Sequence, residues 1–366
     1  MKLIIKNEVL LNLLKKTIHT GFTNTNNKIL NYLIFKVKNN KLFILSSNLE
    51  VEMMVSVDLK EFNKDGKSAI LAKKIIYICR NFPKNSNILI KSDTNKVLVY
   101  SKNMRYSLNT MEVDDFPRIK FENKYYKYSI SEKFLKKAIN LLKFVAPDND
   151  VRNYLNGILI EKINNILYIT ATDGHRLATY KILTDCLNNI NSIIIPKKTV
   201  IEIQYLLEKD KEVNLLISNK FIKLKIRNYY ITSKLINGKF PNYHHLLNKK
   251  YKKNIKIESN SFRNSLSRIS ILVDDKLRLI KIKIKKNKLK ITTNNSIQEK
   301  AEEIIKIKNK KNFSIEIGVN IDYILDIVNV LKCKKIKFSF NDNISSLKIE
   351  NMENKNICYI LMPIMI

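Results

Sequence analysis

The chain has 366 residues, 45% of them hydrophobic, which is enough for two or three domains with buried cores. Its formal charge of +34, from 67 basic and 33 acidic residues, indicates a polyanionic partner such as nucleic acid. No uncharged apolar run of about 18 residues, no signal-peptide pattern and no CxxC pair occurs, so a membrane span, export and a zinc or disulfide framework are not expected. A reducing cytoplasm is the expected location.

The excess charge has two explanations that composition leaves open. Only nine of the 67 basic residues are arginine, while lysine, asparagine and isoleucine are abundant. This pattern is typical of a coding bias toward A- and T-rich codons, which would place lysine at every solvent-facing position. It is equally typical of a surface that binds nucleic acid. The positions of the charges must decide between them.

The predicted elements repeat one order three times: a helix, alternating strands, a second helix and more strands. In the first copy, helices are predicted at 8–18 and 72–82, with strands at 41–47, 51–59, 87–92, 96–101 and 105–110. In the second copy, helices are predicted at 131–145 and 197–209, with strands at 156–162, 166–174, 213–218, 221–227 and 229–235. In the third copy, helices are predicted at 259–272 and 320–332, with strands at 278–286, 288–293, 335–340, 345–350 and 358–366.

Short similar segments recur at the same place in each copy. The segments FILSSNLE, YITATDGH and KITTNNSI fall at matching places, and Phe116-Pro117 recurs as Phe240-Pro241. A period of about 120 residues is the size of a domain rather than of a solenoid repeat. We therefore expect an α+β protein of three similar domains, each with two helices packed on antiparallel sheets, at 1–122, 127–246 and 248–366.

Basic residues lie on five of the six predicted helices. They are Lys15, Lys16, Lys73, Lys74, Arg80, Lys133, Lys136, Lys137, Lys143, Lys197, Lys198, Arg263 and Arg268. Each could belong to an ordinary solvated helix face. A row of such cations facing a duplex would instead bind phosphates without reading bases.

The segment ITATDGHRLATY (169–180) raises the question of catalysis, because Asp173 and His175 could form an acid–base pair or a metal site. No third ligand with suitable spacing is present, and no Gly-rich phosphate loop or GxSxG elbow occurs. We therefore expect no catalytic residue, metal or cofactor. Asp173-Gly174 is a favoured turn pair between strands, which leaves His175, Arg176 and Leu177 to be explained.

Five motifs resemble one family over the whole chain. They are DVRNYLNGILIE (150–161), TATDGHRLA (170–178), ITSKLINGKFPNY (231–243), NIDYILDIVNVLKC (320–333) and YILMPIMI (359–366). In these segments the chain is similar to the bacterial DNA polymerase III beta subunit, the sliding clamp. The resemblance implies a head-to-tail homodimer that closes a six-domain ring around double-stranded DNA, with helices lining the hole. Such a ring tethers the replicative polymerase and catalyses nothing.

The resemblance also implies three sets of site residues. DNA contacts would come from Asn24, Lys73, Arg80, Asn149, Asn153, Tyr154, Lys197 and Lys198, with Asn24 at a position where the family has arginine. The dimer seam would use Lys74, Arg105, Tyr106 and Leu108 of one chain against Ile271, Leu272, Glu299 and Glu303 of the other. Lys300 replaces an acidic residue of the family there.

The third set is a pocket for short apolar peptides, shared by the polymerase, the clamp loader and repair proteins. Its expected wall is Leu155, Thr172, Gly174, His175, Arg176, Leu177, Pro241, His245, Leu246, Leu277, Ile344, Ser346, Leu361, Met362, Pro363 and Ile364. His245 stands where the family has arginine and Leu277 where it has phenylalanine, so we expect a more apolar pocket. The competing hypothesis is a basic nucleic-acid-binding protein that forms no ring.

Overall fold

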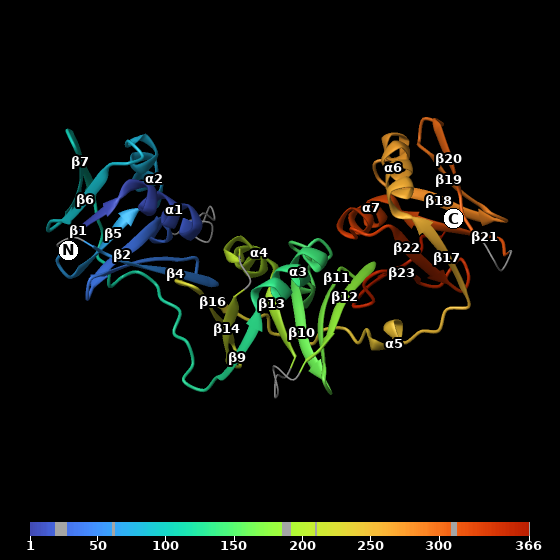
Figure 1. Cartoon of the computed structure of the whole chain (residues 1–366), viewed down its shortest axis with the longest axis horizontal. Helices are drawn as coiled ribbons and strands as arrows, with labels where there is room; N and C mark the ends of the chain where they lie inside the picture. The colour runs from blue at the N-terminus through green and yellow to red at the C-terminus, as the bar shows by residue number, and fades with distance from the viewer. Residues whose placement is uncertain (19–27, 61–62, 185–191, 209–210, 309–312, 366) are drawn as a thin grey trace. The chain divides into compact units, whose positions relative to one another are not determined.

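The computed structural model describes residues 1–18, 28–60, 63–184, 192–208, 211–308 and 313–365 (Figure 1). These residues form two compact units. Unit 1 contains Met1–Lys136 and Lys198–Leu235, and unit 2 contains Lys137–Lys197 and Ile236–Ile366. Each unit holds one eight-stranded and one four-stranded antiparallel sheet. The division falls inside the expected central domain, because that segment gives strands to both eight-stranded sheets; the expected domain boundaries stay predictions.

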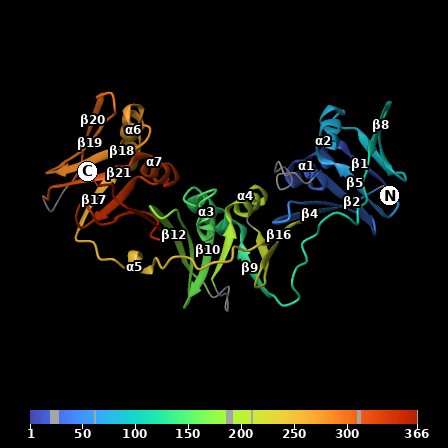
Figure 2. The ribbon, with the colours of Figure 1, turned by 180° about the vertical axis from the view of Figure 1, so that it is seen from behind.

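Unit 1 is built on two sheets. Its four-stranded sheet has the order β1 (Lys2–Lys6), β6 (Asn87–Ser92), β7 (Lys96–Ser101), β8 (Met104–Asn109). Its eight-stranded sheet has the order β5 (Gly66–Leu71), β2 (Tyr32–Lys38), β3 (Lys41–Ser47), β4 (Val51–Asp58), β16 (Tyr229–Lys234), β15 (Phe221–Ile226), β14 (Glu212–Ile217), β9 (Tyr126–Ser131). Helices α1 (Asn7–Ile18) and α2 (Ala72–Asn81) pack against each other (Figure 2).

Unit 2 repeats this arrangement. Its eight-stranded sheet has the order β13 (Ile193–Pro196), β10 (Gly157–Ile163), β11 (Ile166–Thr172), β12 (Arg176–Leu183), β24 (Ile357–Leu361), β23 (Leu347–Asn351), β22 (Lys335–Phe340), β17 (Lys253–Glu258). Its four-stranded sheet has the order β20 (Lys300–Lys306), β19 (Lys288–Asn294), β18 (Leu279–Lys285), β21 (Ile315–Asn320). Helices α6 (Ser259–Ile269) and α7 (Ile321–Val330) pack together, and α5 (His244–Leu247) is a single turn. Helices α3 (Glu132–Leu142) and α4 (Lys197–Leu206) cross the division between the units.

The helices begin where the sequence supplies caps and apolar stripes. The side chain of Asn320 caps α7 by accepting from the N–H groups of Asp322 and Tyr323, at 2.9 and 3.3 Å. Helix α2 buries Ile75 and Cys79 on one face and exposes its cations on the other. All six helices expected from periodicity are present, whereas the short α5 was not expected.

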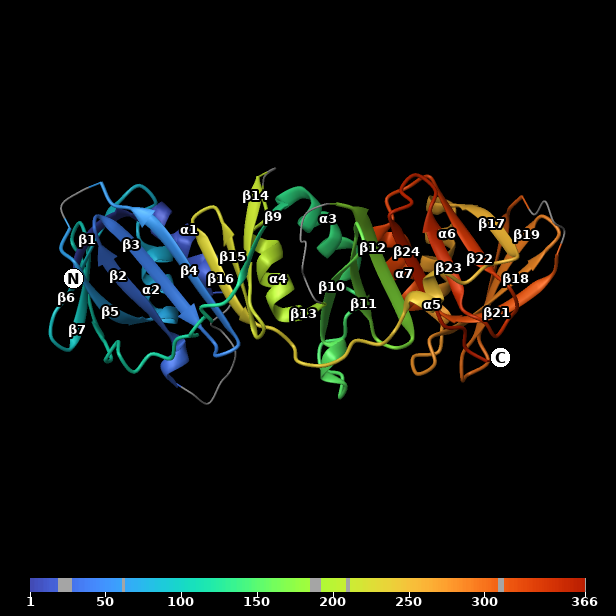
Figure 3. The ribbon, with the colours of Figure 1, turned by 90° about the horizontal axis from the view of Figure 1, so that it is seen from below.

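Strand pairing within the units follows a rule of the repeat. The fourth strand of each copy of the repeat pairs with the last strand of the next copy. Thus β4 pairs with β16, and β12 pairs with β24 (Figure 3). The same rule leaves two sheet edges without a partner strand in the described chain. These edges are β8 in unit 1 and β20 in unit 2.

Candidate functional site

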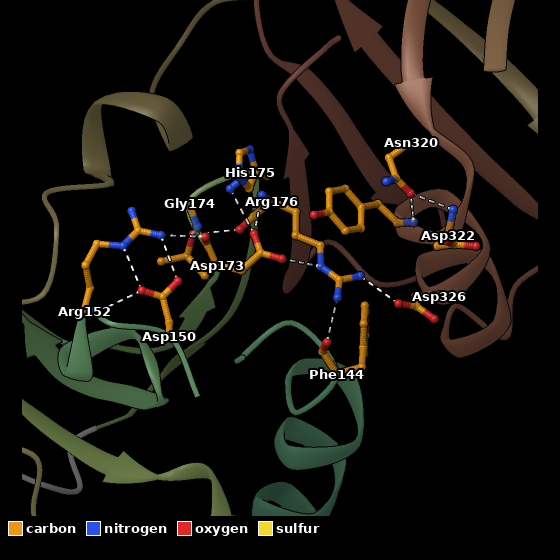
Figure 4. Close-up of polar contacts among 12 residues, drawn as sticks. Phe144, Asp150, Arg152, Asp173, Gly174, His175, Arg176, Asn320, Asp322 and Asp326 are labelled. Carbon is orange, nitrogen blue, oxygen red and sulfur yellow. Dashed lines mark hydrogen bonds and ion pairs between the residues drawn. The ribbon is translucent and has the colours of Figure 1, made fainter. Parts of the chain in front are cut away.

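A tight turn joins β11 to β12 and presents the segment 173–176 (Figure 4). The Oδ1 atom of Asp173 accepts from the backbone N–H groups of His175 and Arg176, each at 2.9 Å. Gly174 has a φ of +92°, and a Cβ atom there would lie 3.1 Å from the guanidinium of Arg152. The turn expected from the Asp-Gly pair is therefore confirmed, and glycine is needed for both its φ and its neighbour.

Arg176 ties this turn to two other elements of unit 2. Its Nε donates to Asp173 at 2.9 Å, its Nη1 to Asp326 of α7 at 2.7 Å, and its Nη2 to the carbonyl of Phe144 at 2.9 Å. The guanidinium lies 4.4 Å from the ring centroid of Tyr323, and the side chain is only 11% exposed. Because its charge is used within the chain, Arg176 holds the site together rather than offering a free cation.

Arg152 forms the polar rim of the turn. It makes two hydrogen bonds to Asp150, at 3.0 and 2.9 Å, and a third to the carbonyl of Asp173 at 3.1 Å (Figure 4). The Arg152 guanidinium lowers the pKa of Asp150 to about 2. Both ends of this pair are in reach of solvent, so it orients the loop more than it stabilises the fold.

A cavity of about 130 Å³ opens beside the turn. Nine of the residues expected for the peptide pocket line it: Leu155, Thr172, Gly174, His175, Arg176, Leu177, Pro241, Leu246 and Met362. Four further lining residues were not expected: Arg152, Asn242, Tyr243 and Ile360. Tyr243 and Ile360 belong to the buried cluster beneath, at 3% and 1% exposure. The cavity therefore has an apolar floor and a polar rim, which suits an apolar peptide.

The other residues expected for this pocket do not line the cavity. Leu361 is buried within β24, where it pairs with Arg176 of β12, and Ser346 is buried beside Tyr251. Leu277 and Ile344 are exposed, at 64% and 66%. The remaining ones are His245 in α5, Pro363, and Ile364, whose N–H donates to the carbonyl of Gly318. Their part in peptide binding stays a prediction.

The residues expected to contact DNA fall into three groups. Asn24 lies outside the described residues. Lys73, Arg80 and Lys198 are exposed on α2 and α4, and Asn149 and Asn153 are exposed in the loop before β10, beside the half-buried Tyr154. Lys197 differs, since its ammonium binds Asp148 at 2.9 Å and its side chain is only 16% exposed. Binding a phosphate would require Lys197 to leave this carboxylate.

Some residues expected at the dimer seam are exposed, whereas others are buried or already bound within the chain. Arg105 and Tyr106 are exposed on β8, whereas the side chain of Leu108 is buried in unit 1, at 6% exposure. Ile271 is 78% exposed, and Leu272, in the same short turn, is half-buried. Lys74 and Glu299 are exposed, while Glu303 is held by Arg268 at 2.6 Å. Leu108 can therefore contribute its backbone edge more readily than its side chain.

No group of three or more His, Cys, Asp or Glu residues is placed to hold a metal ion in the described part of the chain. Among the described helices, none is long and apolar enough to span a bilayer. His175 and Asp173 meet only through the backbone N–H of the histidine.

Family models decide the identity. Three models of the DNA polymerase III beta subunit match the chain: the N-terminal domain at 1–120, the central domain at 129–242 and the C-terminal domain at 244–365. The chain belongs to the beta sliding clamp family. It is accordingly a DNA sliding clamp, a non-catalytic processivity subunit of DNA polymerase III.

Individual beta sliding clamps agree over the full length. The chain is 34% identical to the beta sliding clamp of Proteus mirabilis, with 99% of each chain covered. It is 36% identical to that of Buchnera aphidicola subsp. Rhopalosiphum padi, also with 99% of each covered. The crystal structure of the Pseudomonas aeruginosa DNA polymerase III subunit beta superposes with a TM-score of 0.96, at 30% identity and full coverage of both chains.

Proposed function

We propose that two copies of this chain join head to tail into a closed ring around double-stranded DNA. The observation that carries this proposal is the pair of sheet edges left by the repeat, β8 and β20. If the rule that pairs β4 with β16 and β12 with β24 continues between chains, β20 of one chain would pair with β8 of another chain. A second chain would pair both of these edges at once, which removes two of the exposed edges that sheets must otherwise protect.

The repeat also suggests a register for the seam. If β8 and β20 pair as β16 and β4 do, Arg105 would lie opposite Glu302 of the second chain, and Leu108 opposite Glu299. Cross-strand pairs of opposite charge stabilise such a ladder, because their Cβ atoms lie about 5 Å apart. Glu302 is also bound to Lys290 of its own chain, at 2.6 Å, so Arg105 would complete a small charge network.

Inside the ring, the helices would carry the contact with DNA. Lys73, Arg80 and Lys198 are exposed side chains on α2 and α4 that could reach phosphates without reading sequence. Lysine suits a sliding contact, because its ammonium is a flexible point charge rather than a fixed fork. Retention then depends on ring closure, while the phosphate contacts stay weak.

The cavity of unit 2 would dock the partners. An apolar peptide segment fits its floor, where Leu177 and Ile360 lie, and Met362 can adjust to different partners because methionine repacks easily. We infer that the replicative polymerase, the clamp loader and repair proteins compete for this cavity, in the cytoplasm where replication proceeds.

The seam is tested by its mass in solution. Twice the 42.9 kDa mass of one chain is expected for the unmodified protein, and a smaller mass for Arg105→Glu. Adding Glu302→Lys to Arg105→Glu should restore the dimer, since the positive and negative charges at each seam are then exchanged and attract again. Lys102→Glu, in the exposed turn before β8, is the matched control and should leave the mass unchanged.

The two hypotheses give different masses. A monomer for the unmodified chain, at concentrations where it still binds DNA, would contradict the ring and favour the basic nucleic-acid-binding protein. A dimer that tolerates Arg105→Glu and gains nothing from Glu302→Lys would place the seam elsewhere.

A further inference from the structure

Unit 1 has an open slot on the solvent face of β2, β3 and β4, which lie side by side in Figure 3. Its volume is about 220 Å³. Apolar and aromatic side chains form its floor and cations form its sides; the lining residues are Ile34, Lys36, Lys38, Phe43, Leu45, Met54 and Arg118. The slot is independent of the peptide cavity, which lies in unit 2.

The internal repeat shows what such a surface can hold. Strands β10 and β11 pair in the register of β2 and β3, which places Glu161 at the position of Lys36 and Tyr168 at that of Phe43. In unit 2 this surface is covered by the chain itself. The hydroxyl of Tyr243 donates to Glu161, and the ring of His244 meets that of Tyr168 edge-on, with centroids 5.2 Å apart. Tyr243 is only 3% exposed as a result.

The chain takes a different course in unit 1. After Phe116-Pro117, the counterpart of Phe240-Pro241, Arg118 turns to Glu52 and binds both carboxylate oxygens, at 2.8 and 3.1 Å. The N–H of Ile119 donates to the same carboxylate at 3.1 Å. Phe116 packs with Ile34 and Leu45 in a buried cluster, at 4% exposure. The part of the slot beside Phe43 and Met54, which are half-buried, and the exposed Lys36 stays open.

The charge of the slot is also reversed relative to its counterpart. Lys36 stands where unit 2 has Glu161, and Lys38 extends the positive edge. Both are exposed, and neither has an acidic partner among the described residues. Lys67 lies directly opposite Lys36 on β5, but Asp114 pairs with it. Like charges in cross-strand positions repel, so a carboxylate bound in the slot would reduce the repulsion between its lysines.

We propose that this slot is a second docking site, for a partner-protein peptide with an aromatic side chain flanked by acidic residues. The ring would lie against the half-buried Phe43, as the ring of His244 lies against the matching Tyr168 in unit 2. The carboxylates would meet Lys36 and Lys38. Both ion pairs are exposed to solvent, so binding is weak and sensitive to salt. This inference does not depend on the ring.

Two methionines make the test specific to each site. Met54 lines the slot and Met362 lines the cavity of unit 2, so methyl spectra of the full-length protein with labelled methionines report each site separately. The probe is the acetylated peptide FPNYEELL, which is segment 240–247 of this chain with both histidines replaced by glutamate. Its counterpart FPNYKKLL has the same apolar residues and the opposite charge.

We expect the glutamate peptide to shift the Met54 signal at concentrations at least about tenfold lower than the lysine peptide, and the shift to weaken with salt. Charge reversal by Lys36→Glu with Lys38→Glu should invert this preference. The matched control, Lys281→Glu with Lys285→Glu on β18 of unit 2, changes the same charge and should leave the Met54 response unchanged.

Other results would overturn the proposal. They are no shift of Met54 with either peptide, equal shifts with both, or a Met54 shift that persists in the Lys36→Glu, Lys38→Glu variant. A Met54 signal that moves with protein concentration alone would make a second copy of this chain the occupant, which also contradicts a partner peptide. A response of Met362 alone would assign the peptide to the cavity of unit 2.

Discussion

At the scale of single residues, Arg176 does the most to hold the site together. One guanidinium joins the turn at Asp173, the backbone at Phe144 and helix α7 at Asp326. Arg176 is 11% exposed and Asp173 is 14% exposed, so removing either side chain would leave the other charge poorly solvated and without this partner.

Arg176→Ala should therefore lower the free energy of unfolding by about 3 kcal/mol. Urea unfolding followed by tyrosine fluorescence measures it. Arg152→Ala is the control, since its side chain is 48% exposed and its loss should lower the free energy of unfolding much less than Arg176→Ala does. Similar losses for the two variants would contradict the structural role of Arg176.

Met362 and Met365 provide a matched pair for the cavity. Met362 lines it and is 39% exposed, whereas Met365 is 83% exposed and outside it. Met362→Glu should weaken the binding of an apolar polymerase peptide by at least about tenfold, because a carboxylate would be buried against an apolar floor. Met365→Glu should bind as the unmodified chain does. Fluorescence anisotropy of a labelled peptide measures the affinity of each variant. Equal affinity of the two variants would rule out the cavity as the docking site.

At the scale of elements, α4 combines two carboxylates with opposite shifts. Glu202, within the helix, is 9% exposed, and one of its oxygens has no hydrogen-bond partner in the described structure; burial raises its pKa to about 7. Hydrogen bonds from Lys16 and Arg227 lower the pKa of Glu208, just after the helix, to about 2. The first carboxylate favours the fold only when protonated, and the second only when ionised.

Glu202→Gln should consequently stabilise the protein above pH 7. The folded-state pKa of Glu202 lies above its unfolded value, so its contribution is present below about pH 4.5 and is lost as the pH rises through 7. The gain for the variant should approach roughly 3 kcal/mol at pH 8 and vanish near pH 4. Glu208→Gln should instead lower the free energy of unfolding at pH 7. Unfolding curves across pH test this, and a gain that is independent of pH would contradict it.

Periodicity predicted the long helices well and also predicted many strands, such as β3, β6 and β7, but it missed several others. Helices α2 and α7 have clear apolar stripes, so their positions follow from the sequence. Strand β12 was given no range, although the Asp173-Gly174 turn implied a strand after it; β12 pairs with β11 and also with β24, which is far away in the sequence. The helical turn α5 has only four residues, too few for a periodic signal.

The residues alone predicted only the turn of the site, whereas the resemblance also brought Leu155, Pro241 and Met362 from other segments to the cavity. Tyr243 and Ile360 lie within the quoted motifs but were missed, because each resembles an ordinary buried residue of the core. The ion pair of Lys197 with Asp148 and the bonds of Arg176 to Asp326 depend on tertiary contacts that spacing does not encode.

At the scale of the whole molecule, one repeat used three times explains both the sheets and the proposed assembly. Each copy pairs one strand edge with the next copy, and the first and last copies leave β8 and β20 for a second chain.

The net charge of +34 does not come from the helices alone, because lysines also lie on strands such as β18. Free protein should therefore bind linear duplex with a steep dependence on salt, and an electrophoretic shift that stays flat between low and moderate salt would contradict this.

The ring itself is tested by retention on circular DNA. Protein placed on a nicked circular plasmid by a clamp loader is washed at a salt concentration that removes ordinary phosphate binders, and the plasmid is then cut once. We predict that the protein stays on the circle through the wash and leaves after the cut, because a closed ring can slide off an end but cannot dissociate sideways. Equal loss from circular and linear DNA, or equal retention on both, would contradict a sliding clamp.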